Sequence, residues 1–410
     1  MSYSHLRYIA YHLPTIGFSK GGGGVEYGLS AGPLLDYGDQ KAIFSDYPDM
    51  DVAAGIVNSD NVLAGKPPIY MVNLLGSKKA LETVKGDGDV FVRVQRFLTA
   101  LELAATTVKK RKDLKKDGVL NLFVAPEFYF RPPEEPHTYT EAMHLAIADV
   151  LKNTIDQNEA LEHWLVIPGT IMWTEQFLDT NQLEDTAKRV LIDHNCTYVI
   201  NGGVELMGGQ RINKYTPSRI DGLPSQRLAN GEKIDGVDFD GDWLDRAEFM
   251  RRKDLWPSFS DHVVSFAGVK MGVEICRDHG VLKSYPKTTG NISAQLVVSC
   301  GRTLLPTCAA TVEGGIIMRC DGHHGPGIRW DQRVVNRYET PSGSDRWDDK
   351  AKAVFTPSTQ ALMGQANPYV QLDIPFDTDH PLNWKPSDKV DKKEWVKYKQ
   401  GLTFYSPQIV

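Results

Sequence analysis

Strand-like and helix-like stretches alternate over most of this chain, and this pattern restricts the possible folds more than any other feature. An apolar run at 69–76 is expected to form a buried strand, and helical periodicity covers 90–110. A strand-like run at 119–130 follows, then a helical pattern at 140–155 and another strand-like run at 163–173. Such alternation is typical of layered α/β proteins.

Several later strand-like stretches follow one another closely. Residues 196–206 and 211–217 form a hairpin-like pair around the sequence Met-Gly-Gly, and the runs 262–276 and 294–301 flank a segment that can hold a short helix. Strand pairs joined by glycine turns predict a mixed sheet or two packed sheets. No glycine-rich fingerprint opens a helix after a strand, which argues against a dinucleotide-binding fold.

The two ends of the chain lack this regular pattern. The tract Lys-Gly-Gly-Gly-Gly at 20–24 does not have the ending of a phosphate-binding loop. The last thirty or so residues are rich in Pro, Asp, Lys and Trp. We therefore expect one domain over 68–376, an N-terminal extension over 1–67 that acts as a lid or an oligomer contact, and a C-terminal tail over 377–410.

Charge is spread along the chain. The formal net charge is −6, and the basic residues form no long stripe, so the sequence indicates no nucleic-acid partner. The run Lys-Lys-Arg-Lys-Asp-Leu-Lys-Lys at 109–116 is the exception, and we interpret it as cations near a helix C-terminus.

Cysteine usage and hydropathy bear on the compartment. The five cysteines are scattered and odd in number, so they do not predict a disulfide framework. No stretch approaches the ~18 uninterrupted apolar residues of a membrane span, and the N-terminus lacks the pattern of a secretory signal. These features predict a cytoplasmic protein without a membrane partner.

Three stretches each place a reactive side chain at or near the end of a strand-like run. They are Glu127 in "VAPEFYF", Lys214 in "INKYTP" and Cys276 in "GVEICRDHG". A cysteine attacks carbonyl or nitrile carbon as a thiolate, so it needs a neighbouring base or cation to lower its pKa from about 8.5. Glu127 would accept the thiol proton, while Lys214 and a backbone N–H beside Cys276 would stabilise the oxyanion.

The motifs "PEF", "NKY" and "GVEICRD", in this order and separated by β-rich segments, resemble the Glu, Lys and Cys motifs of the nitrilase (carbon-nitrogen hydrolase) superfamily. The resemblance extends over roughly 68–376 and includes "VIPGT" and "LVVSCG". It implies an α-β-β-α sandwich that pairs into homodimers or larger assemblies. It also implies hydrolysis through a covalent acyl-enzyme, without a metal or an organic cofactor.

The resemblance also concerns a second glutamate and the substrate. Many members carry a glutamate between the lysine and the cysteine; Glu248 is the best match, and Glu232 remains an alternative. Arg277 and Asp278 resemble the amidase and carbamoylase branches, whereas nitrilases usually continue with Trp and Glu after the cysteine. We therefore expect cleavage of an amide or carbamoyl C–N bond in a small molecule, with nitrile hydrolysis as the alternative.

Three other interpretations remain. Cys276 could work with His262 or His279 as an imidazole base, although no flanking residue supports this pairing. The chain could also be a catalytically idle scaffold subunit of the same fold, because folds outlive their activities.

The third alternative is a zinc site in the stretch "CDGHHGPG". It would use Cys320, His323 and His324 as ligands. No second ligand pair lies at a suitable spacing, so a polar loop is the favoured interpretation.

Overall fold

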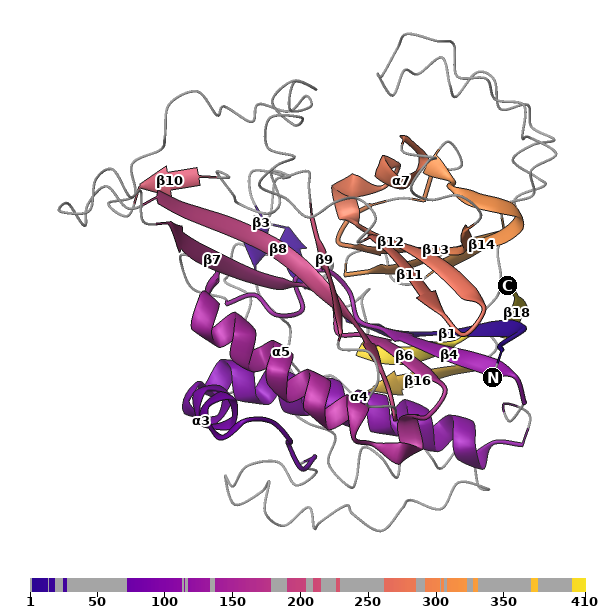
Figure 1. Cartoon of the computed structure of the whole chain (residues 1–410), viewed down its shortest axis with the longest axis horizontal. Helices are drawn as coiled ribbons and strands as arrows, with labels where there is room; N and C mark the ends of the chain where they lie inside the picture. Colours follow the sequence, from indigo (N-terminus) through magenta and orange to yellow (C-terminus); the bar gives the residue numbers. More distant parts are fainter. Residues whose placement is uncertain are drawn as a thin grey trace, which may run out of the picture.

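The computed structural model describes residues 2–13, 15–18, 25–27, 72–112, 114, 117–132, 137–177, 190–203, 209–214, 226–228, 262–284, 292–302, 304–305, 308–322, 327–330, 370–374 and 400–410. In this part of the chain, helices and two larger sheets form layers, which confirms the α/β class expected from the sequence (Figure 1).

The larger sheet holds eleven strands within the described residues. Its hydrogen-bonded order is β16 (Val370–Ile374), β17 (Gln400–Phe404), β1 (His5–His12), β4 (Val119–Val124), β6 (Trp164–Ile167), β8 (Val190–Asn201), β7 (Ile171–Phe177) and β5 (Tyr139–Thr140). Off this path, β9 (Gln210–Asn213) and β10 (Gln226–Leu228) pair with β8, and β18 (Gln408–Ile409) pairs with β1. The central strands β1, β4 and β6 run parallel.

The second sheet has five strands in the described ranges. Its order is β11 (Val263–Phe266), β12 (Val269–Ile275), β13 (Ile292–Ser299), β14 (Thr311–Asp321) and β15 (Gly327–Trp330). The middle strands β12, β13 and β14 are parallel, and the outer strands pair antiparallel with them. A separate small pair joins β2 (Ile16–Phe18) to β3 (Val25–Tyr27).

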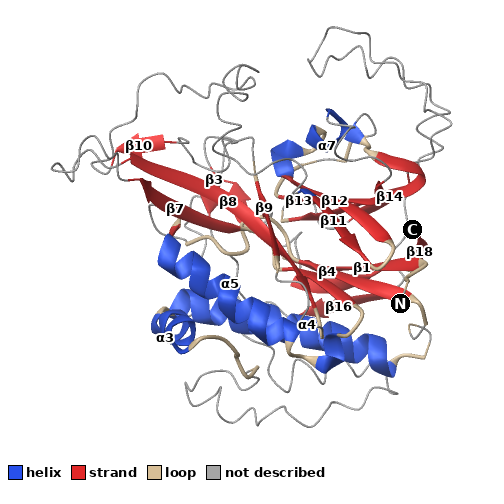
Figure 2. Cartoon of the chain, in the orientation of Figure 1, coloured by secondary structure: helices blue, strands red, loops and turns tan. Residues whose placement is uncertain are grey.

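Three helices lie along one face of the larger sheet (Figure 2). They are α3 (Lys78–Gly86), α4 (Gly88–Lys110) and α5 (Glu141–Asp156). The side chain of Asp87 caps the start of α4 by accepting from the Val90 N–H, and Lys109 and Lys110 lie in its last turn, where cations favour the helix dipole. Shorter turns are η1 (Glu159–Leu161), η6 (Cys276–Asp278) and α7 (Val281–Ser284). No helix in the described part combines the length and apolar character needed to cross a membrane.

Successive side chains of a strand point to opposite faces of the sheet, so the buried side chains divide between two cores. Ile9 and Phe123 face the helices, whereas their neighbours Tyr8 and Leu122 face the second sheet. Val273, Leu296 and similar residues of β12, β13 and β14 complete the core between the sheets. Each sheet therefore contributes one apolar face to a shared interior, and the order of layers is helices, larger sheet, smaller sheet (Figure 1).

The outer face of the smaller sheet carries α7. A β-carbon on Gly272 of β12 would approach Leu282 of α7 to 2.5 Å, so this helix packs tightly against the strand. Val297 and Ile317 also face outward and pack with Leu304 and Ala309 of the following segment.

Most expected elements are present with adjusted ends. The helices expected at 90–110 and 140–155 are α4 and α5, and the expected hairpin is β8 with β9. The run 163–173 divides into β6 and β7, and 262–276 divides into β11 and β12. The breaks fall at Pro168-Gly169 and at Ala267-Gly268, where Gly169, Ala267 and Gly268 adopt positive φ.

The strand expected at 69–76 was a wrong prediction over its described part. Residues 72–75 form no strand. The side chain of Gln95 bonds both the N–H and the carbonyl of Val72, at 2.9 and 3.1 Å, and Thr154 Oγ1 accepts from the Leu75 N–H at 2.9 Å. Side chains of α4 and α5 therefore satisfy backbone groups that a neighbouring strand would otherwise bond.

The ends of the chain contribute to the larger sheet. β1, from the segment expected to be an extension over 1–67, lies between β4 and β17. Both β17 and β18, from the segment expected to be a tail over 377–410, pair antiparallel with β1. These strands come from opposite ends of the sequence, so their pairing has no local signal.

Candidate active site

Glu127 lies in a tight turn that follows β4. Ala125 and Phe130 remain in the sheet through hydrogen bonds to Ile167 and Thr170, both 2.9 Å long. Between them, Phe128 adopts a left-handed φ of 65°, and its N–H donates to Thr170 Oγ1 at 2.8 Å. The turn holds the Glu127 side chain inside the protein, where it is fully buried.

Lys214 follows β9 and forms a buried ion pair with Glu127. The distance from Lys214 Nζ to Glu127 Oε1 is 2.8 Å, and the two side chains are 2% and 0% exposed. The Phe128 ring lies beneath the ammonium, with 5.9 Å between Nζ and the ring centroid. The structure therefore brings together two of the three residues singled out in the sequence, 87 positions apart.

Asn195 of β8 organises both members of this pair, and the sequence analysis missed it. Its Nδ2 donates to Glu127 Oε1 at 3.0 Å, and its carbonyl accepts from the Lys214 N–H at 2.8 Å. The predicted hairpin offered one signal, because its register places Cys196 opposite Asn213 and hence Asn195 beside Lys214. A buried polar side chain at that point of the strand can be identified only once the register is known.

Cys276 occupies the sharp turn at the carboxyl end of β12. It adopts a φ of 48°, a left-handed conformation that costs a non-glycine residue on the order of 1–2 kcal/mol. The residue is 6% exposed, and its thiol lies 3.9 Å from the Cys300 carbonyl. Strained residues of this kind concentrate at functional sites, where the surrounding structure fixes them.

The ends of the two sheets meet at this site. The N–H of Glu127 donates to the Ser299 carbonyl at 3.4 Å, and the Cys276 thiol points to the next carbonyl, that of Cys300. The end of β13 thus contacts both the turn that carries Glu127 and the turn that carries Cys276. Through this strand end, the Lys214–Glu127 pair and the Cys276 thiol belong to the same region of the protein.

Burial separates three of the other cysteines, Cys196, Cys300 and Cys320, from this chemistry. It raises the pKa of the Cys196 thiol to about 12 and raises the pKa of Cys320 and Cys300 well above the usual range, with the charge of Asp321 adding to the effect at Cys300. Thiols held in the protonated form are poor nucleophiles at neutral pH.

Both ring nitrogens of His279 form hydrogen bonds. Its Nε2 accepts from the Leu305 N–H at 3.1 Å, so the proton resides on Nδ1, which donates to Glu274 Oε2 at 2.9 Å. Taking a proton from Cys276 would break the Leu305 bond. The Nδ1 of His262 contacts the Val273 carbonyl at 2.9 Å. This geometry favours Glu127 over an imidazole as the base.

Of the three ligands in the alternative zinc interpretation, only Cys320 lies among the described residues. Cys320 is buried between the sheets, and its thiol donates to the carbonyls of Val124 and Tyr11 at 3.3 and 3.6 Å. His323 and His324 lie outside the described residues. Within those residues, no group of three His, Cys, Asp or Glu side chains could hold a metal ion.

Both candidates for the second glutamate, Glu248 and Glu232, also lie outside the residues that the structure describes.

Gly169, in the "VIPGT" stretch, supports the turn of Glu127. It adopts a φ of +79°, and a β-carbon there would lie 2.4 Å from the Pro126 carbonyl oxygen and 2.6 Å from Tyr129 Cβ. Gly169→Ala is expected to displace this turn, lowering stability by about 1–3 kcal/mol and reducing turnover. Urea unfolding and steady-state kinetics would measure both effects. Gly86→Ala is the control, because nothing lies within 4 Å of its added β-carbon; equal behaviour of the two variants would contradict this role.

No family model matches the chain, and no curated protein matches it. The crystal structure of an amidase from Nesterenkonia sp. aligns with 81% of this chain and 85% of its own, at 12% identity and a TM-score of 0.32. A mutant of the Nesterenkonia AN1 amidase from the nitrilase superfamily aligns over 58% and 78%, at 13% identity and a TM-score of 0.28.

Proposed function

We propose that this protein hydrolyses a non-peptide amide or carbamoyl C–N bond of a small molecule through a thioester on Cys276, within a nitrilase-type α-β-β-α sandwich. One observation supports the proposal: the turn of Glu127, whose side chain pairs with Lys214, and the Cys276 thiol both contact the end of β13. A carboxylate, an ammonium and a thiol in one site can supply the base, the cation and the nucleophile of acyl transfer.

The first half of the reaction forms the thioester. Glu127 accepts the thiol proton, and the Cys276 sulfur attacks the carbonyl carbon of the substrate. The oxygen of the resulting tetrahedral intermediate carries a negative charge, which Lys214 and a backbone N–H beside Cys276 stabilise. Glu127 then delivers its proton to the leaving nitrogen, the C–N bond breaks, and ammonia or an amine departs.

The second half returns the enzyme to its starting state. Glu127 removes a proton from a water molecule, and the resulting hydroxide adds to the thioester carbonyl. The same cation and N–H stabilise the second oxyanion. Collapse of the intermediate breaks the C–S bond, and the proton on Glu127 returns to the thiolate while the acid leaves.

A panel of compounds tests the bond that is broken. The purified protein is incubated with small amides, N-carbamoyl amines and nitriles, and released ammonia and acid are measured. We expect turnover in the first two classes, on the basis of Arg277 and Asp278 after the nucleophile. Turnover of nitriles alone would assign the chain to nitrile hydrolysis, and no turnover in any class would favour the idle scaffold.

Glu127→Gln is expected to reduce the rate by on the order of 10² or more, because the amide cannot accept the thiol proton. The substitution keeps the size of the buried side chain, so thermal unfolding should show a folded protein. Near-normal kcat in Glu127→Gln, together with an inactive His279→Ala, would transfer the role of base to His279.

We propose that Glu248 orients the substrate beside Lys214. This assignment rests on the resemblance to the superfamily and on the position of Glu248, 276 − 248 = 28 residues before the cysteine. Glu248→Gln and Glu232→Gln are compared in the same assay. An increase in KM confined to Glu232→Gln would move the role to that residue.

The proposal extends to a cytoplasmic homodimer or larger homo-oligomer, as the resemblance implies. Light scattering on the purified chain measures the assembly. A monomer at micromolar concentration would contradict this part.

A further inference from the structure

A second buried carboxylate lies two residues before the proposed nucleophile. Glu274 is fully buried in β12, and each of its oxygens accepts two hydrogen bonds. The N–H groups of Gly280 and Leu282 donate to Oε1 at 2.9 and 3.0 Å. His279 Nδ1 and Gln295 Nε2 donate to Oε2 at 2.9 and 2.6 Å. These four donors compensate for the desolvation of the buried charge.

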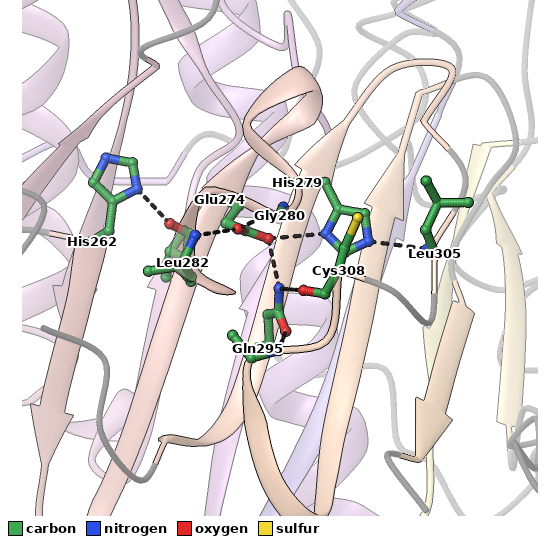
Figure 3. A network of polar contacts seen from close by, with 10 residues as sticks. His262, Glu274, His279, Gly280, Leu282, Gln295, Leu305 and Cys308 are labelled. Atoms are coloured by element: carbon green, nitrogen blue, oxygen red, sulfur yellow. Dashed lines mark hydrogen bonds and ion pairs between the residues drawn. The ribbon is translucent and has the colours of Figure 1, made fainter. Parts of the chain in front are cut away.

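The network continues beyond these donors into the segment after β13 (Figure 3). His279 Nε2 accepts from the Leu305 N–H, and Gln295 donates to the Cys308 carbonyl at 3.1 Å. The carbonyl of the Gln295 side chain accepts from the Ala310 N–H at 2.8 Å. One carboxylate therefore connects β12, the turn after it and β13, and through His279 and Gln295 it reaches Leu305, Cys308 and Ala310.

The position of Glu274 in the chain links this hydrogen-bond network to the turn that holds Cys276. Glu274 precedes Cys276, whereas Gly280 and Leu282 follow it, so the carboxylate fixes both sides of the turn that holds Cys276 at a φ of 48°. The neighbouring Val273 and Ile275 face the core between the sheets, so Glu274 points to the opposite face of β12. Its influence on the thiol must pass through the backbone.

We propose that Glu274 is a positioning residue for Cys276: with His279 and Gln295 it holds the nucleophile turn in the left-handed conformation that aims the thiol at the substrate. The inference rests on the proposed function, because it presumes that Cys276 is the nucleophile. It gives a residue of the Cys motif a role besides those of the base, the cation and the nucleophile.

Glu274→Gln is the first test. The amide oxygen can keep the bonds to Gly280 and Leu282, but the amide nitrogen then faces two donors, from His279 and Gln295. We expect kcat to fall by about 10²-fold with little change in KM, because a small displacement of a reacting group has such effects. The rate of Cys276 alkylation by iodoacetamide, followed by peptide mass spectrometry, should fall as well.

The matched control is Gln95→Leu. Gln95 is also buried and also bonds a loop backbone, at Val72, but it belongs to α4 on the far side of the larger sheet. The Gln95→Leu protein should be less stable than the wild type but should keep both its kcat and its rate of Cys276 alkylation. Equal kcat in Glu274→Gln and the wild type would overturn the inference, as would a loss of kcat that only follows the unfolded fraction.

A pair of His279 variants gives a second test if Glu274→Gln does not fold. In His279→Asn the amide nitrogen lies near the place of Nδ1 and keeps the donor to Glu274. In His279→Gln the amide lies near the place of Nε2 and can bond only Leu305. We expect His279→Asn to retain more kcat than His279→Gln, and equal or reversed values would overturn the inference.

Failure of the proposed function gives a different result. Either the wild type would then turn over none of the compounds, or Cys276→Ala would remain active, whatever the Glu274 and His279 variants show. An inactive Cys276→Ala together with normal Glu274 and His279 variants would retain the function and remove only the positioning role.

Discussion

Cys276→Ala is expected to abolish turnover of every substrate while the fold persists. The rate should fall on the order of 10⁶-fold, as it does when a serine hydrolase loses its nucleophile. The side chain is small, and its thiol contact to Cys300 is long at 3.9 Å, so its removal costs little stability. Steady-state kinetics measures the first effect, and a thermal melt measures the second.

Cys196→Ala is the matched control for this variant. Cys196 is a buried thiol of the larger sheet that packs with the helix-facing core, and burial raises its pKa to about 12. Its replacement should leave kcat unchanged. A Cys276→Ala protein with more than a trace of activity, or a Cys196→Ala protein that is folded but inactive, would place the nucleophile elsewhere.

Lys214→Met is expected to destabilise the protein strongly, in addition to stopping catalysis. The change leaves the buried Glu127 carboxylate without its ion-pair partner at 2.8 Å, and breaking a buried pair in this way typically costs about 3–5 kcal/mol. Urea denaturation measures the loss.

The double variant Lys214→Met/Glu127→Gln separates charge from packing. It removes both charges, so most of the lost stability should return, because a buried pair replaced by neutral groups of similar size is often neutral in stability. Activity should stay absent in the double variant. A double variant less stable than Lys214→Met alone would show that the pair stabilises the fold by more than mutual neutralisation.

The sequence predicted those parts of the fold that depend on local patterns. Apolar periodicity located α4 and α5, and the turn glycines separated β8 from β9. The pairing of β1 with β17 and β18 joins residues about four hundred positions apart, so no local pattern reveals it. The apolar run at 69–76 predicted a strand wrongly, because the side chains of Gln95 and Thr154 bond its backbone in place of a neighbouring strand.

Glu127, Lys214 and Cys276 were chosen as candidates from residue types and motif order, whereas the residues that support them were not. Glu127 and Lys214 are in contact, and Cys276 lies beside the same strand end. Asn195 and Glu274 escaped notice because their roles depend on strand register and on which face of a strand they occupy. A sequence shows that a polar residue interrupts a buried strand, but its hydrogen-bond partners come from segments far away in the chain.

The covalent step at Cys276 is the part of the proposed mechanism on which the other assigned roles depend. Intact-mass spectrometry of the full-length protein, quenched in acid during turnover of an amide, tests it most directly. We predict a mass increase equal to the acyl group of the substrate, located on the peptide that contains Cys276, present in the wild type and absent in Cys276→Ala. Turnover without any adduct on that peptide, or an adduct that persists in Cys276→Ala, would contradict the account.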